Sequence, residues 1–165
     1  MADTNRTVEL EDEESGASTS GYIRLLAVNG NPVDNQVIVC KDPQSDFSVV
    51  VEEDAKVAYA YLKRGEEIVG DVWLYNKGPA PPRSEWDDPS RMPFANVAGY
   101  VRDEPPPTDV RQETISCRWR RGPKGVETAE VLIRDTVYGV VAPGAKPGWA
   151  RLAKRDGPAA KVLRQ

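Results

Sequence analysis

The sequence predicts a mainly β protein, a single-domain antiparallel β sandwich or barrel of about nine short strands. Short apolar stretches with period-two alternation recur along the chain, and proline and glycine separate them. No segment shows the apolar periodicity of an amphipathic helix. A chain of 165 residues is also long enough to form one domain with its own hydrophobic core.

The first 20 residues differ in composition from the rest of the chain. They contain six acidic residues and one basic residue, and their only large apolar side chains after Met1 are Val8 and Leu10. So little apolar surface cannot offset the entropy lost on ordering, so we expect residues 1–20 to be a disordered acidic tail. The remaining residues 21–165 are then expected to form the single β domain.

Three strands are expected next, over residues 22–28, 36–41 and 47–51. Their branched and aromatic side chains favour strands, and the first has apolar residues on both faces. Residues 29–32, Asn-Gly-Asn-Pro, indicate a turn because asparagine and glycine tolerate positive φ.

A hairpin over residues 57–75 is the predicted centre of the domain. Residues 57–62 and 67–75 form its strands, with Ile68 of the second strand expected in the core, and the polar residues 63–66 supply a four-residue turn. Gly70 inside the second strand indicates a bulge or the close approach of another backbone. Asp71, in the same strand, is expected to be half-buried and hydrogen-bonded.

A proline-rich segment, residues 76–108, interrupts the strand pattern. It holds eight of the 14 prolines, which lack the backbone donor that a central strand or helix needs. It also carries large apolar side chains, whereas a solvated linker would not. Loops of this length are usually functional or packed on their own side chains. This loop is the best candidate for a working surface, and the alternative is a purely structural loop whose aromatics cap one end of the sandwich. The large apolar residues are Trp86, Met92, Phe94 and Tyr100.

The C-terminal third returns to the strand pattern. Residues 113–120 alternate strictly, so that Trp119 faces the core while Arg118 and Arg120 face solvent. The cysteines, Cys40 and Cys117, are expected to be buried in strands, and the sequence leaves open whether they form a disulfide. Further strands are expected over residues 126–134, 136–142 and 149–153, and residues 160–163 form either a pairing strand or a helical turn.

The chain contains no histidine, which excludes Ser-His-Asp and Cys-His catalysis. No glycine-rich phosphate loop or zinc motif is present, and no cofactor or metal site is predicted. An enzyme would have to use the carboxylates of Glu85, Asp87 and Asp88, which flank Trp86, as a glycosidase uses its acid pair. Adjacent acids on a loop are usually solvated, so we predict no enzymatic activity and no catalytic residues.

The favoured hypothesis is a small non-enzymatic protein-binding domain, such as an intracellular inhibitor or a toxin-neutralising, immunity-like partner. A structural or assembly component, such as a viral or phage protein, is one alternative. Single-stranded nucleic-acid binding is another, suggested by basic residues near Trp119 and Trp149 but opposed by a pI of about 5.0. The expected partner-binding residues are Trp86, Met92, Phe94, Tyr100, Glu85, Asp87 and Asp88.

Neither a signal peptide nor an apolar run of about 20 residues is apparent, so a cytoplasmic protein without membrane contact is expected. The oligomeric state does not follow from the sequence.

Overall fold

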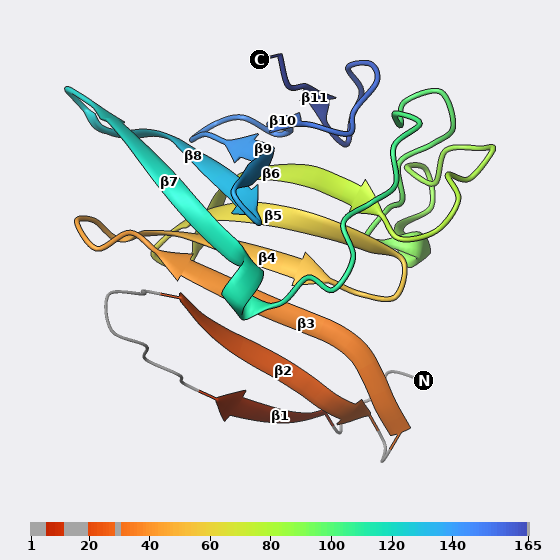
Figure 1. Cartoon of the computed structure of the whole chain (residues 1–165), viewed down its shortest axis with the longest axis horizontal. Helices are drawn as coiled ribbons and strands as arrows, with labels where there is room; N and C mark the ends of the chain where they lie inside the picture. Colours follow the sequence, from red (N-terminus) through yellow and green to blue (C-terminus); the bar gives the residue numbers. More distant parts are fainter. Residues whose placement is uncertain (1–5, 12–19, 29–30, 165) are drawn as a thin grey trace.

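The computed structural model describes residues 6–11, 20–28 and 31–164, and it is mainly β. Two sheets pack against each other without closing into a barrel in the described part of the chain (Figure 1). The first is an antiparallel meander in which each strand pairs with the next in the chain. Its strands are β1 (Arg6–Glu11), β2 (Ser20–Val28), β3 (Asn31–Lys41), β4 (Phe47–Glu53), β5 (Val57–Arg64) and β6 (Glu67–Asn76).

The second sheet has the strand order β11-β10-β9-β8-β7. It is antiparallel from β7 to β10, whereas β11 runs parallel to β10. The sharp connection from β8 to β9 uses Arg134 and Asp135, both with positive φ, which suits a tight hairpin turn. The strands are β7 (Ile115–Gly122), β8 (Gly125–Ile133), β9 (Thr136–Val141), β10 (Trp149–Ala150) and β11 (Lys161–Val162).

The expectation of a disordered tail over residues 1–20 is not confirmed. Arg6–Glu11 form β1, which pairs along β2, and β2 itself begins at Ser20. Backbone hydrogen bonds to β2 thus stabilise this segment, although it has few apolar side chains to bury. Residues 1–5 and 12–19 lie outside the described residues, as do residues 29–30 of the predicted turn.

The predicted central hairpin is β5–β6, with a shorter turn than expected. Only residues 65–66 connect the strands, and Gly65 takes a positive φ of 59°. The pairing register shifts between Leu62 and Lys63. Beyond this irregularity the period-two pattern no longer holds, so Ile68, predicted as core, is 44% exposed.

Gly70 marks the close backbone approach that the sequence predicts. A Cβ atom on Gly70 would lie 2.5 Å from the carbonyl oxygen of Ala142. The loop after β9 pairs with β6 here, because Asp71 N donates to Ala145 O at 3.2 Å and Gly148 N donates to Asp71 O at 2.7 Å. These hydrogen bonds cover the edge of β6 that does not pair with β5. They thus protect the first sheet from pairing with another chain at this edge.

Half-buried residues form a row across the outer face of the first sheet. Val39, Val50, Tyr61 and Asp71 are successive cross-strand partners from β3 to β6. Burial raises the pKa of Tyr61 to about 12. Burial also raises the pKa of the Asp71 carboxyl, and the charge of Lys146 opposes that rise.

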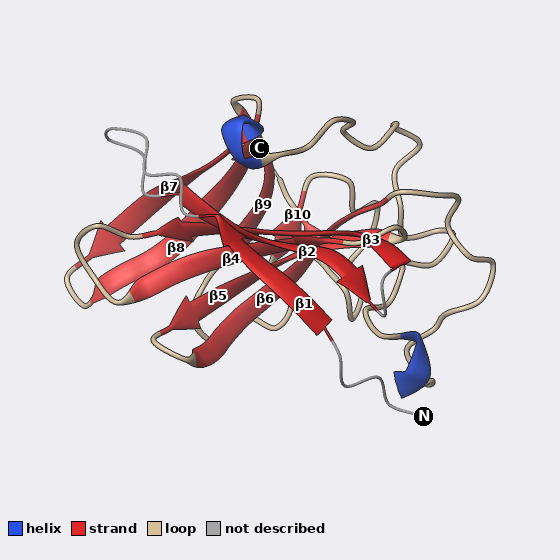
Figure 2. Cartoon of the chain, turned by 90° about the horizontal axis from the view of Figure 1, so that it is seen from below, coloured by secondary structure: helices blue, strands red, loops and turns tan. Residues whose placement is uncertain are grey.

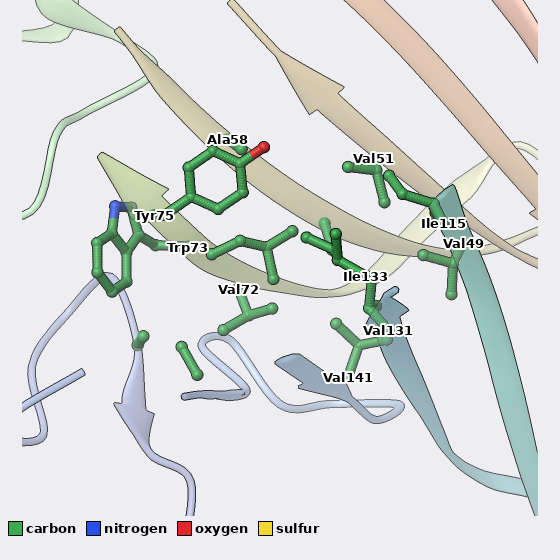
Figure 3. Packing of buried hydrophobic residues seen from close by; sticks show 14 of the residues in the cluster. Val49, Val51, Ala58, Val72, Trp73, Tyr75, Ile115, Val131, Ile133 and Val141 are labelled. Carbon is green, nitrogen blue, oxygen red and sulfur yellow. The ribbon is translucent and has the colours of Figure 1, made fainter. Parts of the chain in front are cut away.

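The hydrophobic core lies between the two sheets (Figure 3). Val72 of β6, Val131 of β8 and Val141 of β9 are completely buried there. Gly139 lets the sheets approach, because a Cβ on it would lie 2.5 Å from Cδ2 of Leu74. Each fully buried valine or leucine contributes about 1.5–3 kcal/mol, so this interface is the main source of stability.

The two cysteines face each other across the sheets. Cys40 on β3 is buried and Cys117 on β7 is partly buried, and they do not form a disulfide. A hydrogen bond between the two sulfur atoms, with burial, raises the pKa of Cys117. Trp119, also on β7, is partly buried against the core as predicted. No helix in the described part of the chain is long and apolar enough to cross a membrane.

Candidate functional site

Residues 77–111, here called the long loop, connect β6 to the second sheet and contain the predicted site. They form no strand beyond an isolated bridge from Val101 to Ala153. The 3-10 turn η1 (Pro89–Arg91) lies in their middle, and η2 (Gln112–Thr114) follows them. Figure 2 shows the long loop gathered beyond one end of the sheets, with η1 far from η2.

Glu85 fastens the first half of the long loop to the sheet. Its buried carboxylate accepts hydrogen bonds from Lys56 Nζ and Ala95 N, both at 2.9 Å, and Arg91 Nη1 lies 3.6 Å away. Burial raises the pKa of Glu85, but these hydrogen bonds and positive charges outweigh it and lower the pKa overall. Glu85 is therefore a charged structural anchor, and its oxygen atoms are already engaged.

Two buried asparagines hold the base of the loop. Asn76 Oδ1 accepts from Trp73 Nε1 and from Asn96 N, while Asn76 Nδ2 donates to Asn96 O, all at 2.8 Å. Asn96 Oδ1 in turn accepts from Val97 N at 3.1 Å. This network satisfies the polar groups that the loop buries against β6.

Phe94 is fixed through its backbone. The hydroxyl of Tyr59 on β5 donates to Phe94 O at 2.7 Å, and the Phe94 side chain is partly buried. The Tyr59 ring stacks on Tyr61 with a centroid separation of 6.1 Å, and burial raises the pKa of Tyr59. The chain following η1 is thus held against the outer face of the first sheet.

Trp86 and Tyr100 pack on each other instead of projecting into solvent. Their rings meet edge to face at 5.7 Å, and Arg155 lies over the Tyr100 ring at 5.2 Å. Lys154 N donates to Tyr100 O at 2.8 Å. Trp86 Nε1 is buried and has no hydrogen-bond partner. These two aromatics join the loop to the C-terminal segment.

The outermost part of the long loop, here called the loop tip, is the group Asp87, Asp88, Arg91 and Met92. Met92 is 65% exposed, and with Ile68 it is one of two exposed large hydrophobic residues among residues 35–164. Asp88 caps η1 by accepting from Ser90 N at 3.1 Å and Ser90 Oγ at 2.6 Å. Of the seven predicted residues, Met92, Asp87 and Asp88 are at the surface, and the other four pack beneath them.

A second candidate region, a hollowed surface beside β11, was not predicted from the sequence. One depression of about 400 Å³ and another of about 370 Å³ share Val162, Leu163 and Arg164 as lining residues. The sequence signals for this surface are Trp149 and the charge around it, since residues 144–165 hold six basic residues and one acidic residue.

Among the residues described, no three histidine, cysteine, aspartate or glutamate side chains gather closely enough to hold a metal ion. No protein-family model, curated protein or solved structure matches the chain. The candidate site is therefore defined by its own geometry, an anchored loop with an exposed apolar tip.

Proposed function

We propose that this chain is a non-enzymatic protein-binding domain that contacts its partner through the loop tip. One observation carries the proposal. The long loop presents the exposed Met92 on a base that is fixed by buried hydrogen bonds to Glu85, Asn76 and Asn96.

Preorganisation favours binding because an ordered loop loses little conformational entropy when the partner arrives. Methionine is enriched at protein interfaces, and its flexible apolar side chain adapts to a partner's pocket. Charges of both signs belong to the same loop tip as Met92, since Arg91 Nε lies 3.5 Å from Asp88 Oδ2. An apolar centre with a charged rim is the usual anatomy of a specific interface.

An intracellular inhibitor, or an immunity-like partner that neutralises a toxin, is the form of this function that we favour. Such a partner uses a rigid scaffold to present a small loop surface, without chemistry of its own. A role in assembly would instead require the chain to associate with itself, which light scattering over a concentration series detects as a rising apparent mass.

The test compares two matched surface substitutions in affinity capture from the cells that produce the protein. Met92→Asp should abolish capture of the partner, while Ile68→Asp, at the other exposed large hydrophobic, should leave it intact. Circular dichroism would verify that both variants fold. Equal capture by Met92→Asp and the unmodified protein would contradict the proposal.

A further inference from the structure

Three arginines from separate parts of the chain line one depression beside β11. Arg102 comes from the long loop, Arg151 follows β10, and Arg164 follows β11. The depression has a volume of about 370 Å³, within the range of small-ligand sites. Val162 and Leu163 complete its lining.

Backbone hydrogen bonds fix the segments that carry these arginines. Arg102 N donates to Leu152 O at 2.8 Å, and Arg151 N donates to Tyr138 O at 2.9 Å. The chain before Arg164 is held in the same way, because Leu163 N donates to Ala150 O at 3.1 Å. A ligand would therefore meet guanidinium groups on an ordered frame.

The charge in this depression is only partly compensated. Among the described residues, Glu104 is the acid paired with the lining arginines, at 3.9 Å from Arg102 Nη1 and 3.9 Å from Arg151 Nε. Both distances are at the long end for an ion pair, and all three side chains are partly exposed. Glu104 thus lies near two of the three lining guanidinium groups, and the remaining positive charge leaves the site attractive to an anion.

The second depression extends this positive surface past an aromatic ring. It shares Val162, Leu163 and Arg164 with the first and adds Trp149 and Lys161. Lys161 Nζ lies 5.0 Å from the centroid of the Trp149 ring. One acid, Asp156, also lines it, where its Oδ1 accepts from Val162 N at 2.8 Å, so one carboxylate stands against the two cations Lys161 and Arg164.

We propose that the two depressions bind a single-stranded nucleic acid, with one phosphate among Arg102, Arg151 and Arg164. Arginine forks match phosphate oxygens in geometry, and Lys161 would meet a following phosphate. Successive cations beside an aromatic side chain on a sheet surface suit a strand of repeated phosphates and bases better than a single small anion. This site is separate from the loop tip, so it adds a binding activity to the proposed protein binding.

The test measures fluorescence anisotropy of a labelled oligothymidylate of about 12 nucleotides with the full chain. Two phosphate contacts, one at the arginines and one at Lys161, predict that affinity falls about sevenfold between about 50 and 200 mM salt. The double variant Arg102→Glu/Arg164→Glu should bind about tenfold or more weakly and show a shallower salt dependence. Arg64→Glu, a single charge reversal on the exposed β5–β6 hairpin, should bind normally.

Three results would overturn this inference. They are equal binding by the double variant and the unmodified protein, equal binding of a duplex of the same length, and binding of phosphatidylglycerol vesicles without binding of the oligonucleotide. Circular dichroism would confirm that the double variant is folded. Met92→Asp should leave oligonucleotide binding unchanged, which separates failure of this inference from failure of the proposed protein binding.

Discussion

The two ends of the sheets are held together by different chemistry. At one end, here called the turn end, short connections join β3 to β4, β5 to β6 and β7 to β8, and a charged pair links the sheets. At the other, the loop end, the long loop lies beyond the strands (Figure 1), and it is held by the neutral amides of Asn76 and Asn96 and by the charged Glu85. The link at the turn end therefore depends on ionisation, whereas the loop end also uses a network of uncharged hydrogen bonds.

The clamp at the turn end consists of Asp42 and Arg121. The Asp42 side chain is 0% exposed, and its two oxygens accept from both terminal nitrogens of Arg121. Ser45 Oγ and Gln44 N donate to the same carboxylate. The hydrogen bond from Arg121 is the main cause that lowers the pKa of Asp42 to about 2, and burial opposes it.

The contrast shows two ways in which the fold fixes a segment to the sheets, one with an ion pair and one with amide hydrogen bonds. A single bidentate ion pair links segments 79 residues apart, but it requires a buried charge. The amide network around Asn76 needs no charge, but it needs every donor and acceptor to be matched. The loop that carries the proposed binding tip is attached partly by this uncharged network and partly by the ionised carboxylate of Glu85.

The largest effect is expected from Asn76→Ala at the loop end. This change leaves Trp73 Nε1, Asn96 N and Asn96 O without their partner in a buried place. The free energy of unfolding should fall by about 3 kcal/mol, as measured by urea denaturation. Ser90→Ala, on the exposed part of the same loop, should change it by less than about 0.5 kcal/mol. Similar losses in both variants would contradict the role of the network.

Asp42→Asn at the turn end should cost about 2 kcal/mol at pH 7, because it removes the charge that Arg121 faces. The folded pKa of Asp42, about 2, lies below the unfolded value of about 3.9. The stabilisation is therefore fully present above about pH 4 and is lost as the pH falls towards 2.

Denaturation curves at several pH values check this prediction. The difference between Asp42→Asn and the unmodified protein should shrink on acidification, while the deficit of Asn76→Ala should not follow the Asp42 titration. A pH-independent deficit for Asp42→Asn would show that the ionised pair is not what links the sheets at the turn end.

Lys56→Met should act locally at the loop end. It removes the ammonium that donates to Glu85 and to Arg91 O, both at 2.9 Å. Because the pair is partly exposed, the expected cost is about 1 kcal/mol, so amide exchange in residues 85–95 should speed up about fivefold. Lys77→Met is a matched control, since Lys77 lies 3.3 Å from Glu53, away from η1. Unchanged amide exchange in Lys56→Met would show that the Lys56–Glu85 pair does not anchor the long loop.

The smallest effects are expected at the two exposed hydrophobic residues. Met92→Ser and Ile68→Ser should each change the midpoint of thermal unfolding by less than a few degrees, because neither side chain is buried. A large loss of stability with Met92→Ser would mean that the loop tip packs against the domain, and it would weaken the case for an interface there.

Much of the strand pattern was predictable because alternation and turn residues act over a few neighbouring positions. Trp119 lies against the core because the strict alternation of its strand continues in β7. Gly70 was recognised as a site of close approach, although its partner, Ala142, was not. Ile68 was misplaced because the register of β5 and β6 shifts beside it, and a single-residue shift exchanges the two faces of a strand.

The candidate site was predicted only in part. Met92 was expected at the surface and is exposed there. Glu85 and Tyr100, in contrast, contact other parts of the loop, through the hydrogen bond from Ala95 N and the ring of Trp86. The depressions beside β11 escaped prediction because Arg102 and Arg164 are far apart in the chain and meet only through folding.

By itself, the sequence determined the fold class, the position of most strands and the place of the long loop, because these depend on local alternation, turn residues and proline. Only the tertiary structure decided which polar groups pair across the domain, such as Asn76 with Asn96 and Asp42 with Arg121. Those pairings require two segments to be desolvated together at a fixed distance, and no local pattern in the chain encodes that distance.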